Sequence, residues 1–421
     1  MSPKSPECSI NLNIPAELTP AEMTSVSYSP DEGATWTTYQ INSTSQTIQV
    51  DFQLGEKVYF KGLGKQCCTG FDANGYCPSL RFSGTGRYKV SGNIMSLLYG
   101  DDFASQTECP EGSTFTFAEL FVGNSLLNSA EDLVLPAMTL TPYCYYGLFY
   151  QCKHLTKAPQ LPATTLDTDS YNYMFGNCTA LKVAPDLSAT TMGHLSCANM
   201  FEGCVSMTEA PELPATTMSE FGYSFMFDGC TSLTEAPALP ATTLAASCYE
   251  SMFINCQNLV SAPQLLATTL ADCCYKGMFE RCTELHELVC LATDISAKDC
   301  TKEWFLNGST SGTFYKAPEM EDWPLDTIDG VPTGWTVVDF NAVDEQQDQM
   351  VIYPNPVVDK LHINGSDIQS VKVFDMQGRL VHSVECGHAD QVEVDFQDLT
   401  KGIYIVSILS EGKVVNQQVV F

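Results

Sequence analysis

Long hydrophobic runs and positive charge are the two features that this sequence lacks most clearly. No apolar stretch in its 421 residues approaches the about 18 residues that a membrane-spanning helix requires. Lysine and arginine together number 20, against 50 aspartate and glutamate, which gives a formal net charge of -30. Such an acidic chain is repelled by phosphate backbones, so we expect no transmembrane segment and no nucleic-acid partner. The acidic excess fits either solubility or attraction of Ca²⁺ or basic partners.

The start of the sequence also lacks the pattern of a secretory signal peptide. The first ten residues, MSPKSPECSI, contain no apolar segment of the kind that a secretory signal requires. If the protein is exported, we expect that the signal has been removed or lies upstream.

Catalytic motifs are absent as well. The sequence contains no H-E-x-x-H, G-x-S-x-G, Walker A or strand-linked dinucleotide motif, and none of its six histidines recurs at a fixed repeat position. Cys152 and His154 lie close in sequence, but Cys152 belongs to a repeated column and His154 to a variable position. We therefore expect no enzyme, no cofactor and no metal site.

A 26-residue repeat is what the sequence does contain. The unit TSLTEAPALPATTLAASCYESMFINC, at Thr231–Cys256, is one copy of it. A Leu-x-Ala or similar anchor recurs without insertion in steps of 26 residues, and one cysteine follows each Met-Phe or equivalent pair at a fixed distance. These cysteines are Cys152, Cys178, Cys204, Cys230, Cys256 and Cys282. Self-similarity at such a period is typical of stacked repeat architectures.

Each repeat is predicted to form one coil. LTEAPAL reads as a short strand, with Leu233, Ala236 and Leu239 directed inward, and CYESMFINC as a short helical or 3₁₀ return. Met252, Phe253 and Cys256 have the spacing of an inner face. A single coil cannot bury these residues, whereas stacked coils can. The cysteine columns fit buried thiols, disulfides between coils or, least well, a zinc ladder.

The repeat motif resembles the leucine-rich repeats of BspA-type bacterial surface proteins over residues 121–312. This resemblance implies a cell-surface protein with a curved binding face, and it names no ligand. Before the repeats, β-branched and aromatic alternation predicts a β-rich region. Within it, CCTGFDANGYC (Cys67–Cys77) reads as a metal loop or, preferably, as a disulfide-closed hairpin around the Asn74-Gly75 turn.

The C-terminal part changes character after the polar, acidic stretch DFNAVDEQQDQM, which predicts a linker. The strand-like alternation that follows predicts an antiparallel β-sandwich. Its motifs YPNPV, VFDMQGRLV and LTKGIYIV resemble the type IX secretion C-terminal sorting domain. The resemblance implies contact with the type IX machinery and a secreted or outer-membrane surface location in a Gram-negative, Bacteroidetes-type bacterium. The motif residues are Tyr353, Pro354, Asn355, Pro356, Gly378, Gly402 and Tyr404.

Together these patterns predict an α+β leucine-rich-repeat solenoid with parallel strands on one face and short helical or 3₁₀ returns. A β-rich N-terminal region and a C-terminal antiparallel β-sandwich flank it. The predicted segments are a β-rich region at 1–120, the solenoid at 121–312, its C-terminal cap at 313–338, a linker at 339–350 and the sorting domain at 351–421.

Function is expected at repeat positions that vary beside the inward residues of each predicted strand. We call the following fourteen residues the candidate face: Thr156, Lys157, Gln160, Lys182, Asp186, Thr208, Glu209, Glu212, Thr234, Glu235, Ser261, Gln264, His286 and Glu287. A wide polar face suits a protein or an extended glycan better than a small molecule. The first hypothesis is adhesion to host or other cell-surface proteins, and the alternative is a glycan-binding accessory protein. A third hypothesis is an enzyme with its site in the first domain, which a pocket joining Asp72, Asn74 and the nearby cysteines would support.

Overall fold

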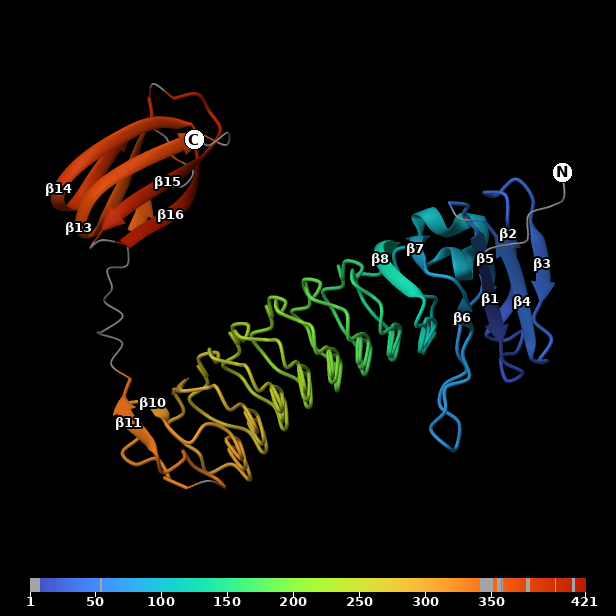
Figure 1. Cartoon of the computed structure of the whole chain (residues 1–421), viewed down its shortest axis with the longest axis horizontal. Helices are drawn as coiled ribbons and strands as arrows, with labels where there is room; N and C mark the ends of the chain where they lie inside the picture. The colour runs from blue at the N-terminus through green and yellow to red at the C-terminus, as the bar shows by residue number, and fades with distance from the viewer. Residues whose placement is uncertain are drawn as a thin grey trace. The chain divides into compact units, whose positions relative to one another are not determined.

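The computed structural model describes residues 8–53, 55–326, 328–340, 351–353, 357, 359–375, 379–397, 399–410 and 413–421. The chain divides into two compact units, Met1–Phe340 and Asn341–Phe421 (Figure 1). Among the described residues, no helix is both long enough and apolar enough to cross a membrane. The segment boundaries predicted at residues 120 and 312 fall inside the first unit and stay predictions.

The N-terminal region is β-rich, as its alternating sequence predicts. Two three-stranded antiparallel sheets have the orders β4-β1-β6 and β3-β2-β5. Their strands are β1 (Cys8–Ile14), β2 (Met23–Ser29), β3 (Thr37–Gln40), β4 (Gln46–Phe52), β5 (Tyr59–Gly64) and β6 (Arg81–Thr85). Short helical segments follow at α1 (Ser96–Tyr99) and η1 (Gly100–Ser105). Alternate residues of β1 (Ile10, Leu12 and Ile14) are buried, because successive side chains of a strand point to opposite faces.

The preferred interpretation of Cys67–Cys77 is confirmed. Cys68 and Cys77 form a disulfide that closes a loop around the turn at Gly75, whose φ is +76°. The Asp72 carboxylate accepts hydrogen bonds from the backbone N–H groups of Asn74 (2.8 Å) and Tyr76 (2.9 Å). These bonds lower the pKa of Asp72.

The first coil of a stack contains β8 (Leu127–Val134), which pairs in parallel with the preceding strand β7 (Tyr88–Asn93), and the coils continue side by side through the repeats (Figure 1). In the return part of each coil, backbone N–H groups alternate between two kinds of partner. Those of Tyr145, Gly147 and Phe149 each donate to a carbonyl of the next coil at 2.9 Å. Those of Tyr146 and Leu148 donate within their own coil, to the carbonyl three residues earlier. Every coil is therefore bonded to its neighbours by its backbone.

The predicted helical returns do not form. Every fourth residue of a return has a positive φ, as at Asp169 (54°), Tyr173 (55°) and Asn177 (59°). A right-handed helix requires negative φ at each residue, so these positions interrupt it after every third residue. The helical elements among the described residues are α1 and η1, of four and six residues, and both precede the repeats.

Continuous parallel strands are also absent from most of the coils, and proline explains why. The N–H of Ala184 donates to the carbonyl of Glu209 at 3.1 Å, but the next residue, Pro185, has no N–H to continue the ladder. Pairing is therefore reduced to isolated bridges such as Val183 with Glu209. The predicted α+β leucine-rich-repeat solenoid is wrong: the structure is mostly β, with 32% strand and 3% helix, in small separate sheets.

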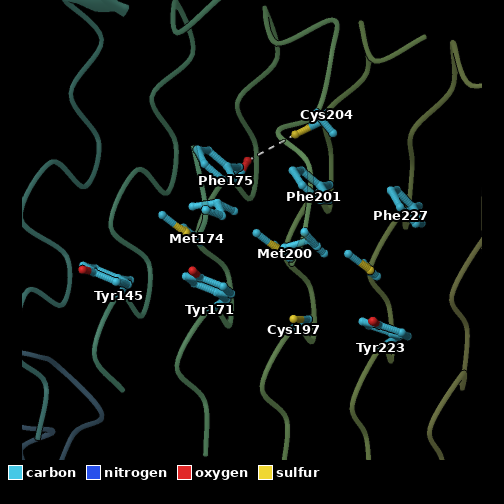
Figure 2. Packing of buried hydrophobic residues seen from close by; sticks show 14 of the residues in the cluster. Tyr145, Tyr171, Met174, Phe175, Cys197, Met200, Phe201, Cys204, Tyr223 and Phe227 are labelled. Carbon is cyan, nitrogen blue, oxygen red and sulfur yellow. Dashed lines mark hydrogen bonds between the residues drawn. The ribbon is translucent and has the colours of Figure 1, made fainter. Parts of the chain in front are cut away.

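The core of the coils consists of columns in which equivalent residues stack. From Phe121 to Phe305, one phenylalanine of each coil lies against the next, with ring centroids 5.4–5.8 Å apart. A tyrosine column runs beside it and is interrupted by Cys197, which lies between Tyr171 and Tyr223 (Figure 2). Offset stacking of this kind adds to the free energy gained by burying the rings.

The cysteines of the repeated column are free, buried thiols that form hydrogen bonds between coils. The Sγ of Cys204 donates to the carbonyl of Phe175 in the preceding coil at 3.2 Å (Figure 2). The same bond recurs at 3.0–3.2 Å for the other five cysteines of the column. Of the interpretations left open by the sequence, buried thiols is the one that the structure bears out.

The last coils end in a parallel sheet of order β11-β10-β9, formed by β9 (Glu287–Cys290), β10 (Gly312–Lys316) and β11 (Trp335–Asp339). Trp335 covers the end of the phenylalanine column, since its ring lies 4.7 Å from that of Phe305. Its indole N–H donates to the carbonyl of Ser309 at 3.0 Å. The indole N–H of Trp304 likewise donates to the carbonyl of Gly330 at 2.7 Å.

The second unit contains one antiparallel sheet in place of the predicted sandwich. Its described strands are β12 (Val351–Tyr353), β13 (Lys360–Asp375), β14 (Leu380–Asp395), β15 (Ile403–Ser410) and β16 (Lys413–Val420). The long strand β13 pairs with β14 along one edge, and with both β12 and β15 along the other. Because all five strands join one curved, half-barrel sheet, the β-sandwich prediction is wrong. Side chains such as Leu361, Val371 and Val406 form the core of this unit.

Candidate functional site

The candidate face lies along the isolated parallel bridges of the coils. Bridges join residues 26 positions apart, such as Val183 with Glu209 and Glu235 with Ser261. At the start of the stack, a bridge with the longer offset of 28 positions joins Ser129 with Lys157. Backbone bonds support the same register, for example from the N–H of Thr208 to the carbonyl of Lys182 at 2.9 Å. A repeat of constant length therefore places one variable position of each coil beside that of the next.

All fourteen residues of the candidate face are exposed to solvent. The intervening Leu and Ala anchors, such as Leu161 and Leu213, are buried and hold the backbone in place. The structure thus leaves each of the predicted residues open to solvent within one compact unit. Their role in binding stays a prediction.

A groove interrupts this surface between two neighbouring coils. Its volume is about 400 Å³, and Pro211 and Pro214 line one side while Pro237 and Pro240 line the other. Glu212 of the candidate face lies in the same lining. The groove therefore combines rigid apolar walls with one carboxylate, which suits a protruding side chain of a partner better than a flat surface does.

The charges of the candidate face are mostly acidic. Its members include five acids, namely Asp186, Glu209, Glu212, Glu235 and Glu287, against the two lysines Lys157 and Lys182. Lys157 forms an ion pair with Glu131 of β8, which raises the pKa of the lysine and lowers that of the glutamate. Because Lys157 is already paired, a partner meets a surface with an unbalanced negative charge.

His286 lies in the last coil that contributes to the candidate face. Its Nδ1 lies 2.7 Å from the carbonyl of Ser311 and 2.8 Å from the hydroxyl of Ser309. These contacts join the histidine to the segment that leads into β10. His286 thus has a structural role in addition to its exposed position.

The residues named for the catalytic alternatives have structural contacts of their own. Cys152 is buried and donates to the carbonyl of Phe121, whereas His154 is exposed. Asp72 and Asn74 form the hairpin turn described above, and neither lines the cavity of about 500 Å³ in the N-terminal part of this unit. In the described part of the chain, no group of three or more His, Cys, Asp or Glu side chains is placed to hold a metal ion.

Two features of the stack are not evident from the 26-residue periodicity. The proline-lined groove depends on how far apart two coils lie, which spacing in the sequence does not report. The first coil begins at Phe115, before the predicted boundary at residue 121. Its three positive-φ residues, Phe115, Glu119 and Gly123, precede the equivalent positive-φ residues of the next coil by 28 positions. A search at spacings of 27 and 28 residues could have found this coil.

Comparison with known proteins identifies the C-terminal unit. Residues 351–421 match the secretion system C-terminal sorting domain. This match covers all the strands β12–β16 of the sheet described above. The sorting domain directs export by type IX secretion and implies interaction with the type IX machinery. The protein is therefore a secreted or cell-surface protein of a Bacteroidetes-type bacterium.

The described motif residues of the sorting domain lie in the structure as follows. Tyr353 ends β12, and the N–H groups of Gly402 and Phe421 each donate to the other's carbonyl at 2.9 Å. Tyr404 is buried against Phe396, and its hydroxyl donates to the carbonyl of Thr400. The predicted motif residues Pro354, Asn355, Pro356 and Gly378 lie outside the described residues.

No curated protein and no solved structure matches the chain. The comparisons also give no support to the resemblance of residues 121–312 to BspA-type leucine-rich repeats. The interpretation of the coils therefore depends on their own geometry.

Proposed function

We propose that the stack of coils is a non-enzymatic binding module that holds an extracellular protein on the candidate face. The observation that carries the proposal is the exposure of all fourteen predicted residues, supported by the bridges that place Lys157, Glu209 and Ser261 beside positions of the neighbouring coils. The sorting domain agrees with it, because an exported chain meets partners outside the cell. The acidic excess favours a basic partner surface.

The test is binding of the full chain to panels of extracellular-matrix proteins and of purified glycans, measured by surface plasmon resonance. The test variant replaces Lys157, Glu209 and Glu235 by serine. The matched control replaces Lys153, Glu220 and Glu284 by serine as well. These are exposed residues of the same types outside the candidate face. We expect saturable protein binding that weakens in the test variant and is retained in the control.

Each other result contradicts the proposal in a different way. Binding to glycans alone would replace it with the glycan-binding alternative. Equal loss of binding in the test variant and the control would place the contact elsewhere on the coils. Binding to neither panel would mean that the coils serve as a spacer.

A further inference from the structure

A cavity of about 500 Å³ lies in the N-terminal part of the first unit, outside the candidate face. Residues of β5, β6, β7, α1 and η1 surround it, and Phe121 of the first coil belongs to its lining. The volume is within the range of roughly 300–1,000 Å³ that is usual for small-molecule sites. No function described above uses this cavity.

The inner end of the cavity is aromatic and tightly packed. The ring of Phe82 stacks on that of Phe121 at 5.3 Å, and Phe60 meets Phe82 edge-on at 5.0 Å. Phe82 and Phe121 are buried, and Phe121 in turn stacks on Phe149 of the next coil at 5.4 Å. The floor is therefore a preformed apolar surface that the phenylalanine column supports.

The outer part of the cavity carries charge. Lys61 places its ammonium group 4.0 Å from the centre of the Trp36 ring, and both carboxylate oxygens of Asp101 accept from it at 2.8 Å. Tyr59, which is 37% exposed, lies in the lining as well. The cavity thus passes from an exposed rim to a buried aromatic floor.

The sign of this charge differs from that of the rest of the chain. The lining contains three lysines, Lys57, Lys61 and Lys89, and two acids, Glu56 and Asp101. The whole sequence has 20 basic against 50 acidic residues. Lys61 is neutralised by Asp101. The Lys89 side chain is 63% exposed, and its ammonium group lies 3.9 Å from Glu131, which Lys157 contacts more closely. Lys57 and Lys89 are therefore the cations best placed to meet a ligand at the rim.

We propose that this cavity binds a small amphipathic organic anion, with its apolar body against Phe60, Phe82 and Phe121 and its acidic group beside Lys57 and Lys89. Burial of the apolar body supplies most of the binding free energy, in proportion to the area removed from water. The lysines select the charged head group, since an exposed ion pair contributes up to about 1 kcal/mol. A linear carboxylate such as decanoate has this chemistry.

The test is isothermal titration calorimetry of the full chain with decanoate and with decan-1-ol, which differ in the charged group alone. We expect one saturable site for decanoate and weaker binding of decan-1-ol. Replacing both Lys57 and Lys89 by glutamine should weaken decanoate binding about tenfold, equivalent to about 1.4 kcal/mol, and should leave decan-1-ol binding unchanged. The control replaces Lys153 and Lys298, which lie outside the lining, by glutamine.

A second variant tests the apolar part. Val90 of β7 also lines the cavity, and Val90→Trp should fill it and reduce the binding of both compounds. Circular dichroism of each variant establishes that it is folded. The absence of saturable decanoate binding would overturn the proposal, and so would equal affinities for decanoate and decan-1-ol. None of the residues changed belongs to the candidate face, so the result is independent of the proposed protein-binding function.

Discussion

At the scale of single residues, the repeated cysteine combines two properties that the stack needs. Its side chain fills a small apolar space, and its thiol supplies a weak hydrogen-bond donor to a carbonyl of the preceding coil. Burial raises the pKa of Cys204 to about 12, so the thiol keeps its proton at neutral pH. A buried, protonated thiol is a poor nucleophile, which agrees with a structural role for this column.

Replacing Cys230 by alanine tests this role. The change removes the sulfur and its 3.2 Å hydrogen bond to the carbonyl of Phe201. We expect the free energy of unfolding to fall by about 1–2 kcal/mol, from the small cavity and the lost donor together. Urea unfolding followed by circular dichroism measures the change. Cys8→Ala, at a partly exposed position outside the coils, is the control, and equal effects of the two substitutions would contradict the prediction.

Two carboxylates of neighbouring coils oppose each other on the return side of the stack. Burial raises the pKa of Glu202, and the charge of Asp228 raises it further. A carboxyl group whose pKa is raised by folding stabilises the fold while it is protonated. This contribution is lost as the pH rises through the pKa of the folded state. At neutral pH the ionised Glu202 therefore costs stability.

The substitution Glu202→Gln should raise the melting temperature at neutral pH, because it removes this charge and keeps an acceptor of similar shape. Below about pH 4, where the carboxyl group is protonated, the variant and the parent should melt at similar temperatures. Differential scanning calorimetry across this range gives the comparison. Glu284→Gln, at an exposed position, should have little effect. A lower melting temperature for Glu202→Gln at neutral pH would refute the explanation.

At the scale of elements, the repeat spacing predicts which side chains are buried but not the path of the backbone between them. Met252, Phe253 and Cys256 are buried as their spacing predicts. Of the residues predicted to point inward from the strand, Leu233 and Leu239 are buried and Ala236 is half-buried. A spacing of one, three or four residues fits the inner face of a helix and equally the inner face of this turn-rich return. The burial pattern therefore could not distinguish the two.

The positive-φ positions are also hidden in the sequence, because many of them hold residues with no preference for that conformation. Leu195, Phe221 and Phe225 have φ of 54–55°. Such residues pay a cost there that the bonds between coils must offset. Local sequence preferences cannot reveal a conformation that only the neighbouring coil stabilises. For the candidate site, variable positions indicated exposure, whereas the groove and the N-terminal cavity depend on distances between elements.

Gly229 offers a direct test of the positive-φ pattern. Its φ is 69°, and a Cβ at this position would come no closer than 3.9 Å to neighbouring atoms. Gly229→Val should therefore destabilise through the backbone alone, by about 1–2 kcal/mol. Gly229→Asn should cost less, since Asn177 and Asn255 occupy the same position in other coils with φ of 59° and 63°. Thermal unfolding of both variants makes the comparison, and equal losses would argue against this backbone explanation.

At the scale of the whole molecule, the chain consists of a unit that presents surfaces and a unit that directs export. Each has its own hydrophobic core: the sorting domain buries Leu361, Ile363 and Val373 among themselves, and the first unit has a separate, continuous core. The first unit should therefore remain folded when the second is removed.

Deleting residues 351–421 in a bacterium that has type IX secretion should keep the protein inside the cell envelope. The sorting domain is what directs export, so the shortened chain should disappear from the medium and the cell surface. Cell fractionation with an antibody against the first unit locates it. Resistance to proteolysis distinguishes failed export from failed folding. Secretion of a folded, shortened chain at the level of the parent would contradict the prediction.

The backbone bonding between coils has a consequence for how such a protein can change over generations. Each coil donates to its successor through the same alternate N–H groups and accepts from its predecessor at the same carbonyls. A recombination event that copies or removes one whole coil therefore rejoins two matching surfaces. The length of the candidate face is thus free to vary in discrete steps, while both ends of the stack stay unchanged.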